Sequence, residues 1–126
     1  MEERTIQEIV FELIKRSSFN EFDGKRVVGD LKKHSGLWEG VIMDRPGNNL
    51  PIDLTKLRDI SDNQYNVDTI FIIPKKGKES QLHKLAKKWK ADEIDWIKGE
   101  LACQLLGDGS TGIKKNPKAI LSIWWD

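Results

Sequence analysis

The sequence predicts an α+β fold, in which helices pack on a mixed sheet of about four or five strands. The first indication is the run Ile70–Ile73, four consecutive β-branched or aromatic residues that end at Pro74. So short an apolar run is typical of a strand covered on both faces, because a strand with one wet face would alternate apolar and polar residues. The second indication is a stretch of apolar residues at helical spacing near the N-terminus. We therefore expect Ile70–Ile73 to be the central strand, with helices packed against it.

The N-terminal part of the chain predicts two helices. Over Thr5–Arg16 the apolar residues recur at helical spacing, and Thr5 and Glu8 have the spacing of a capping box. We expect this apolar stripe to be buried against the sheet. Its members are Ile6, Ile9, Val10, Leu13 and Ile14. A second helix is predicted from about Asp23 to His34.

Strand and turn patterns alternate in the middle of the chain. Leu37–Met43 is mostly apolar and predicts a strand, in which Gly40 indicates a bulge or a close backbone approach. The residues from 44 to 49 have strong turn chemistry. Leu50–Ile60 alternates loosely and predicts a half-exposed strand that leads, through a further turn, into the central strand.

The C-terminal half predicts a helix over Glu79–Trp89, a short helix over Glu100–Leu106 and a final strand over Ala119–Trp125. Ala91–Ile97 can be read as a strand at period two or as a helix, and we favour the strand. The order strand, helix, strand leaves an α/β alternative open, with a parallel crossover in this half of the chain. Such a crossover would be right-handed.

Length and composition limit the classes of protein. The 126 residues are most simply one domain, residues 1–126, and the net charge of +1 argues against a generic polyanion binder with a basic surface all round. The single cysteine, Cys103, excludes an intramolecular disulfide and a cysteine zinc cluster. The acidic N-terminus has no signal-peptide pattern, and no stretch approaches the roughly 20 apolar residues of a membrane span. We expect a soluble, cytoplasmic protein that does not use a membrane.

The candidate ligand site is the loop that follows the central strand, formed by Lys75, Lys76, Gly77 and Lys78. Between Lys75 and Lys90 there are seven lysines and one acid, Glu79. Lysines at the N-terminal end of a helix oppose its dipole by roughly 0.3–1 kcal/mol each, and a bound anion would relieve this. The loop therefore predicts an anionic ligand such as a phosphate. The plain alternative is a solvated loop whose lysines have no ligand.

Two further groups of residues are candidates for function. Trp124 and Trp125 are adjacent in a strand and must point to opposite faces, so an exposed one would be a partner contact and would favour a homodimer through the C-terminal strand. Four aspartates invite a metal or acid–base interpretation, although Asp is also favoured in turns for backbone reasons. They are Asp53, Asp59, Asp62 and Asp68.

The chain shows no catalytic constellation, no cofactor motif and no metal motif, and neither His34 nor His83 belongs to one. The first functional hypothesis is a non-catalytic binding or interaction module with an anion or phosphate site at Lys75–Lys78. The alternative is a nucleic-acid-binding protein that uses the N-terminal half as a winged helix, and a hydrolase that uses the turn aspartates is a third. The winged helix requires one exposed face that carries Lys25, Arg26, Lys32 and Lys33.

Overall fold

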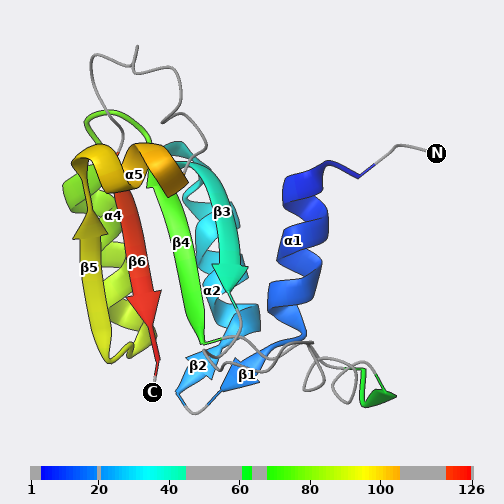
Figure 1. Ribbon diagram of the computed structural model, residues 1–126. Coiled ribbons are helices and arrows are strands. Elements are labelled where there is room, and N and C mark those ends of the chain that lie inside the picture. Colours follow the sequence, from blue (N-terminus) through cyan, green and yellow to red (C-terminus); the bar gives the residue numbers. More distant parts are fainter. Residues whose placement is uncertain (1–3, 20, 45–60, 64–67, 106–118, 126) are drawn as a thin grey trace.

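The computed structural model describes residues 4–19, 21–44, 61–63, 68–105 and 119–125. The described residues form a two-stranded ribbon and a four-stranded antiparallel sheet with the order β3-β4-β6-β5, together with helices (Figure 1). The predicted α+β fold is therefore confirmed. The elements are α1 (Ile6–Lys15), β1 (Ser18–Phe19), β2 (Phe22–Asp23), α2 (Gly24–Lys33), η1 (Ser35–Leu37), β3 (Trp38–Asp44), β4 (Thr69–Pro74), α4 (Glu79–Ala86), η2 (Lys87–Trp89), β5 (Glu93–Ile97), α5 (Gly99–Leu105) and β6 (Ile120–Trp124).

The last strand, β6, lies between β4 and β5 and pairs antiparallel with both. The strands β4 and β5 run in the same direction, as the order strand, helix, strand suggested, but they are not neighbours (Figure 1). The parallel alternative for the C-terminal half is therefore wrong. The physical reason is that β6 lies between β4 and β5 and gives each of them an antiparallel partner, with hydrogen bonds perpendicular to the strands.

One face of the sheet is sealed. Along β4 the burial alternates, and Ile70 and Ile72 are fully buried. Their cross-strand neighbours on this face include Val41 of β3 and Leu121 and Ile123 of β6, which are also buried. The helices α2 and α4 lie behind this face and close the core over it (Figure 1).

The other face of β4 is only partly covered. Phe71 and Ile73 point to this side and stay half-buried. The expectation that Ile70–Ile73 is covered on both faces is therefore wrong for this side. Among the described elements, α5 crosses this face at one end of the sheet, where Ala102 and Ile120 are buried (Figure 1). An uninterrupted apolar run does not by itself report two-sided burial, because half-covered apolar residues produce the same pattern.

The first helix has the predicted capping box but turns a different side inward. The backbone N–H of Thr5 donates to the Glu8 carboxylate at 3.0 Å, which lowers the pKa of Glu8, and the Glu8 N–H donates to Thr5 Oγ1 at 3.1 Å. Phe11 and Ile14 are buried, whereas Ile6 and Ile9 of the predicted buried stripe are exposed.

Aromatic contacts explain this rotation of α1. The Phe11 ring packs edge-on against Trp38, with 5.4 Å between the ring centroids, and the Lys32 ammonium lies 5.9 Å from the centre of the Phe11 ring. Burying a Phe ring removes a large apolar area from water and adds the ring–ring contact. The helix therefore turns towards Phe11 and leaves the isoleucine side of the stripe open.

Indole N–H groups join the helices to the core. Trp89 Nε1 donates to Asp30 Oδ2 at 2.8 Å and ties the end of α4 and η2 to α2. Trp125 Nε1 donates to the carbonyl oxygen of Trp89 at 2.9 Å, and Trp38 Nε1 donates to that of Leu31 at 2.8 Å. These bonds allow large aromatic residues to be buried without leaving a donor unsatisfied.

The remaining elements confirm most of the sequence interpretation. Ala91–Ile97 contains a strand, β5, and α5 and β6 lie where a short helix and a final strand were predicted. The second helix begins after Asp23, whose side chain caps it by accepting from the Arg26 N–H at 3.2 Å. The small β1–β2 ribbon was not predicted, because its strands have two residues each. The half-exposed strand expected at Leu50–Ile60 lies outside the described residues.

The two glycines of α2 should respond in opposite ways to the same substitution. A Cβ at Gly24 would overlap the backbone carbonyl of Ile14, while a Cβ at Gly29 meets nothing within 4 Å. We expect Gly24→Ala to lower the free energy of unfolding by about 1–3 kcal/mol or more. Gly29→Ala should raise it by about 0.5–1 kcal/mol, because alanine favours the helix. Urea denaturation of both variants checks this, and equal midpoints would contradict the close packing of α1 on α2.

Candidate functional site

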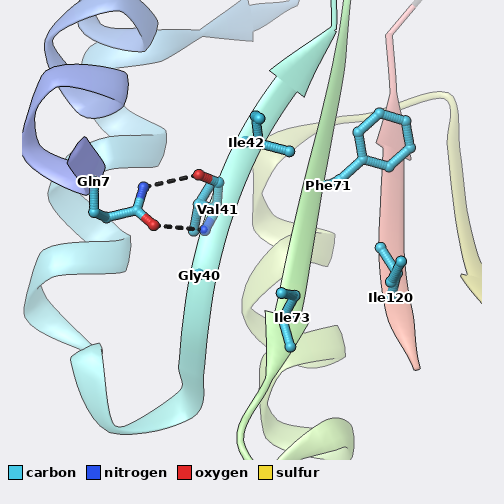
Figure 2. A pocket seen from close by; sticks show the side chains of 7 residues that line it. All are labelled: Gln7, Gly40, Val41, Ile42, Phe71, Ile73 and Ile120. Atoms are coloured by element: carbon cyan, nitrogen blue, oxygen red, sulfur yellow. Dashed lines mark hydrogen bonds between the residues drawn. The ribbon is translucent and has the colours of Figure 1, made fainter. Parts of the chain in front are cut away.

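The side chain of Gln7 joins α1 to the edge of the sheet. Gln7 Oε1 accepts from the Val41 N–H at 2.7 Å, and Gln7 Nε2 donates to the Val41 carbonyl oxygen at 2.8 Å (Figure 2). Val41 belongs to β3, an edge strand, whose alternate residues point their N–H and C=O groups away from β4. The amide of Gln7 thus stands where a further strand would pair, and it closes this edge at Val41.

A hollow of about 380 Å³ lies beside this contact, on the incompletely covered face of the sheet. Figure 2 shows that Ile42, Phe71, Ile73 and Ile120 project to this same side. The volume is within the range of about 300–1,000 Å³ that is typical of ligand pockets, and the lining is mostly apolar, as in such pockets. The lining residues are Gln7, Gly40, Val41, Ile42, Phe71, Ile73 and Ile120.

Gly40 forms part of the floor of this hollow. The register of β3 against β4 shifts between Trp38 and Gly40, so an irregularity lies next to the glycine at which the sequence predicted a bulge or a close backbone approach. A Cβ at Gly40 would lie 3.7 Å from Ile73 Cδ1 and 3.8 Å from Gln7 Oε1. Both atoms belong to residues that line the hollow, so any side chain at position 40 would extend into the hollow.

The exposed isoleucines of α1 do not line the hollow, but Ile6 is on the side of the helix nearer to it. Glu8 and Phe11 are on the α2 side of the helix, because the Lys32 charge acts on Glu8 and lies over Phe11. Around the helix axis, Ile6 is rotated by about 100° from Gln7 in one direction and Glu8 by about 100° in the other. Ile6 therefore faces away from α2 and towards the side of the sheet that carries the hollow.

Some large hydrophobic residues remain exposed, and one of them, Ile42, lines the hollow. In the described part of the chain they are Ile6, Ile9, Ile42 and Leu101, with 77%, 44%, 58% and 55% of their surface exposed. Single exposed apolar residues are ordinary, but a contiguous group around a hollow is typical of a binding surface. We refer to the following residues as the apolar face: Ile6, Ile42, Phe71, Ile73 and Ile120.

The predicted lysine site forms an exposed turn at the end of β4. The Lys78 N–H donates to the carbonyl oxygen of Lys75 at 2.9 Å, and Gly77 has a positive φ of 82°, which suits the third position of a type II turn. The Lys75 N–H donates to the carbonyl oxygen of Leu37 at 3.0 Å and fixes the turn against η1. Lys75, Lys76 and Lys78 are all exposed, and α4 begins at Lys78 without a side-chain cap. The anion site itself remains a prediction.

The remaining lysines of α4, Lys84, Lys87 and Lys88, are also exposed. Lys84 and Lys87 line a second hollow together with His83, whose ring stacks on Trp96 with 6.3 Å between the centroids. This hollow belongs to the helix-covered side of the sheet, so the lysines of α4 and the apolar face are on opposite sides of the molecule (Figure 1).

The two C-terminal tryptophans point to opposite sides, as predicted, but neither is fully exposed. Trp125 is buried in the core, and Trp124 is half-buried with its Nε1 3.3 Å from Asp68 Oδ2. The strand β6 has neighbours on both sides, so it offers no free edge to the homodimer that was expected through it. The physical reason is the insertion of β6 between β4 and β5.

The aspartates are not brought together by the described part of the chain. Asp68 is buried and accepts from Thr69 Oγ1 at 2.8 Å, while Asp62 is exposed. Asp53 and Asp59 lie outside the described residues. No three His, Cys, Asp or Glu side chains among the described residues are placed to hold a metal ion. Within the same residues, no helix has both the length and the apolar character that crossing a membrane requires.

The cations required by the winged-helix interpretation are exposed on α2. Two of them have partners within the chain, because Lys32 lies over Phe11 and Arg26 Nε is 4.0 Å from Asp30 Oδ2. This interpretation stays a prediction.

Comparisons with models of protein families, with curated proteins and with solved structures found no match to this chain.

Sequence reasoning missed the roles of Gln7 and Ile42. One signal could have indicated that part of the apolar side of α1 stays exposed. Its apolar residues extend over more than half of the helix circumference, whereas packing on one core requires an apolar stripe only about 100° wide. Gln7 and Val41 are 34 positions apart in the sequence, so no local sequence pattern predicts their hydrogen bonds.

Removing the Gln7 amide should loosen the β3 edge. We expect Gln7→Ala to lower the free energy of unfolding by about 1–3 kcal/mol, because it leaves the N–H and C=O of Val41 without their partner. Hydrogen exchange at the Val41 amide should become faster in the same variant. Gln81→Ala, at an exposed site on α4, is the matched control and should change neither quantity. Unchanged exchange at Val41 in Gln7→Ala would contradict this description of the edge.

Proposed function

We propose that this protein is a non-catalytic binding module and that the apolar face is its binding surface. One observation carries the proposal: the exposed Ile42 and the half-buried Phe71 and Ile73 line a single hollow, on the side of the sheet that α2 and α4 do not cover. Full burial of an isoleucine side chain is favourable by about 1.5–3 kcal/mol. A partner that covers this face would therefore gain a substantial part of its binding free energy from these three residues.

The chemistry of the hollow favours an apolar partner surface over a small polar ligand. Gln7 is the residue with a polar side chain among those that line it, and both the oxygen and the nitrogen of its amide are engaged by Val41. Pockets for polar metabolites present several convergent polar groups that orient the ligand. Recognition at the apolar face would instead depend on shape and on the removal of apolar surface from water.

A dye with apolar aromatic rings and one sulfonate group tests whether this surface binds. We expect 1-anilinonaphthalene-8-sulfonate to shift the methyl signals of Ile42, Ile73 and Ile120 in NMR spectra. Gly40→Leu should raise its dissociation constant by at least about tenfold, because the new side chain fills the hollow. Gly29→Leu is the matched control, since Gly29 is exposed on α2 and has nothing within 4 Å of its Cβ position. Dye binding that is equal in both variants would rule out the apolar face as the binding surface.

The second candidate function is anion binding at Lys75–Lys78. Its specific support is that the N-terminus of α4 has no side-chain cap and that three exposed lysines directly precede it in the chain. Uncapped helix N–H groups and a positive helix end are favourable to phosphate and carboxylate groups. The turn geometry set by Gly77 brings these lysines to the start of the helix.

Titration with inorganic phosphate tests this second candidate. The amide signals of Gly77, Lys78 and Glu79 should shift, and they should shift less at high ionic strength because exposed charges are screened. Replacement of Lys75, Lys76 and Lys78 by alanine should abolish the shifts. Replacement of Lys84, Lys87 and Lys88 removes the same charge elsewhere on α4 and should preserve them. Amide signals that do not move at the turn would count against an anion site.

A further inference from the structure

We propose that the hollow between α4 and the edge strand β5 binds a nucleotide, either free or as one position of a single-stranded nucleic acid. The base stacks on the aromatic pair His83 and Trp96, and the phosphate is held by Lys84 and Lys87. This hollow lies on the helix-covered side of the sheet, so the inference goes beyond the apolar face and does not depend on it (Figure 1).

The hollow has a volume of about 310 Å³, within the range of about 300–1,000 Å³ that is typical of small-molecule sites. One wall is Trp96 of β5, and the other is a single side of α4 and its continuation η2. Residues 80, 83, 84 and 87 have the spacing of neighbours on one side of a helix. The lining residues are Glu79, Ser80, His83, Lys84, Lys87 and Trp96.

Trp96 differs from the other tryptophans in its hydrogen bonding. The indole N–H groups of the other four each donate to an acceptor in the protein; these residues are Trp38, Trp89, Trp124 and Trp125. Within the described part of the chain, the Trp96 indole N–H has no such acceptor. Its half-buried ring lies at 23° to the ring of His83, with 6.3 Å between the centroids. This indole can therefore stack with a further planar ring and donate a hydrogen bond to it.

The groups that line the hollow follow the order of the parts of a nucleotide. Glu79 and Ser80 are in the first turn of α4, the aromatic pair comes next, and Lys87 is at the far end, in η2. Ser80 and Lys87 are about 10 Å apart along the helix axis, which is about the length of one nucleotide. A carboxylate or hydroxyl at one end can accept from a base amino group, and the ammonium groups at the other end can hold a phosphate.

The carboxylates nearby leave the lysine end of the hollow positive. Glu79, the acidic residue among the lining residues, is eight positions before Lys87, or about 12 Å along the helix. Glu93 and Asp95 of β5 are exposed, but the alternation of the strand places them on the opposite face of the sheet from Trp96. A phosphate next to Lys87 would therefore meet positive charge.

The residue types favour a nucleotide over other aromatic anions. Phosphorylated peptides are recognised by arginine clusters, because the planar guanidinium binds a phosphate through two parallel hydrogen bonds. Among the described residues that line this hollow there is no arginine. Lysine binds phosphate as a point charge, and aromatic side chains stack with any base. Proteins that bind single-stranded nucleic acids combine positive charge with stacking in this way.

NMR titration of the full chain with adenosine 5′-monophosphate tests the inference. The indole N–H signal of Trp96 and the amide signals of His83 and Lys84 should shift and reach saturation. Ribose 5-phosphate, which lacks the base, and adenosine, which lacks the phosphate, should each bind at least about tenfold more weakly. Either fragment binding as tightly as the nucleotide, or shifts confined to Gly77 and Lys78, would overturn the inference.

Two changes to the chain test whether the hollow is the binding site. Trp96→Leu removes the aromatic ring but keeps an apolar side chain, and it should raise the dissociation constant of the nucleotide at least about tenfold. Lys84→Ala combined with Lys87→Ala should do the same, and because both lysines are exposed, this variant keeps the test valid if Trp96→Leu does not fold. Lys33→Ala combined with Lys88→Ala is the matched control. It removes the same charge from exposed positions outside the hollow and should leave the constant unchanged. A lysine pair in the hollow that matters no more than the control pair would contradict the site.

A short single strand separates the two sources of the nucleotide. Hexaadenylate that binds at least about tenfold more tightly than the mononucleotide identifies a position in a single strand, because neighbouring nucleotides then add contacts. Its dissociation constant should also rise with salt concentration. Equal binding of the two identifies a free nucleotide as the ligand.

Discussion

The burial of one face of the four-stranded sheet by α2 and α4 is the interaction on which the rest of the structure depends. Ile70 and Ile72 of β4 and Leu121 of β6 are fully buried beneath these helices. The indole of Trp89 then fixes the two helices to each other through Asp30. Because this one layer supplies the core, the opposite face of the sheet does not need a complete cover for the fold to be stable.

The apolar face follows from that asymmetry. The helix α1 adds to the core through Phe11 and Ile14 and thereby turns Ile6 and Ile9 outward. The side chain of Gln7 then occupies the place at Val41 where a fifth strand would pair. It blocks the addition of a strand to the β3 edge but leaves the face of the sheet open. The proposed binding surface is thus the place where the packing of α1, the edge of β3 and the uncovered side of β4 meet.

The strand β4 contributes to both candidate sites of the proposed function. Its side chains Phe71 and Ile73 form part of the apolar face, and its end leads into the turn Lys75–Lys78 at the start of α4. The two surfaces differ in chemistry: one offers apolar shape, and the other offers positive charge and backbone N–H groups.

The sequence was sufficient wherever the signal is local. Helical spacing and the Thr5–Glu8 pair located α1, the alternation around Ile94 and Trp96 located β5, and Gly40 indicated the irregularity near the start of β3. The turn at Gly77 was likewise predictable, because glycine is the residue that accepts a positive φ at little cost. These features depend on residues a few positions apart, whose backbone preferences act in any context.

Only the tertiary structure decided which apolar residues are covered. The apolar stripe of α1 and the run Ile70–Ile73 both predicted more burial than occurs. The reason is that the hydrophobicity of a side chain indicates how favourable its burial would be, but not whether another element of the structure covers it. The position of β6 between β4 and β5, and the contact of Gln7 with Val41, join segments that are far apart in the chain. Such pairings are chosen by the packing of the whole domain, and they determine where the open face lies.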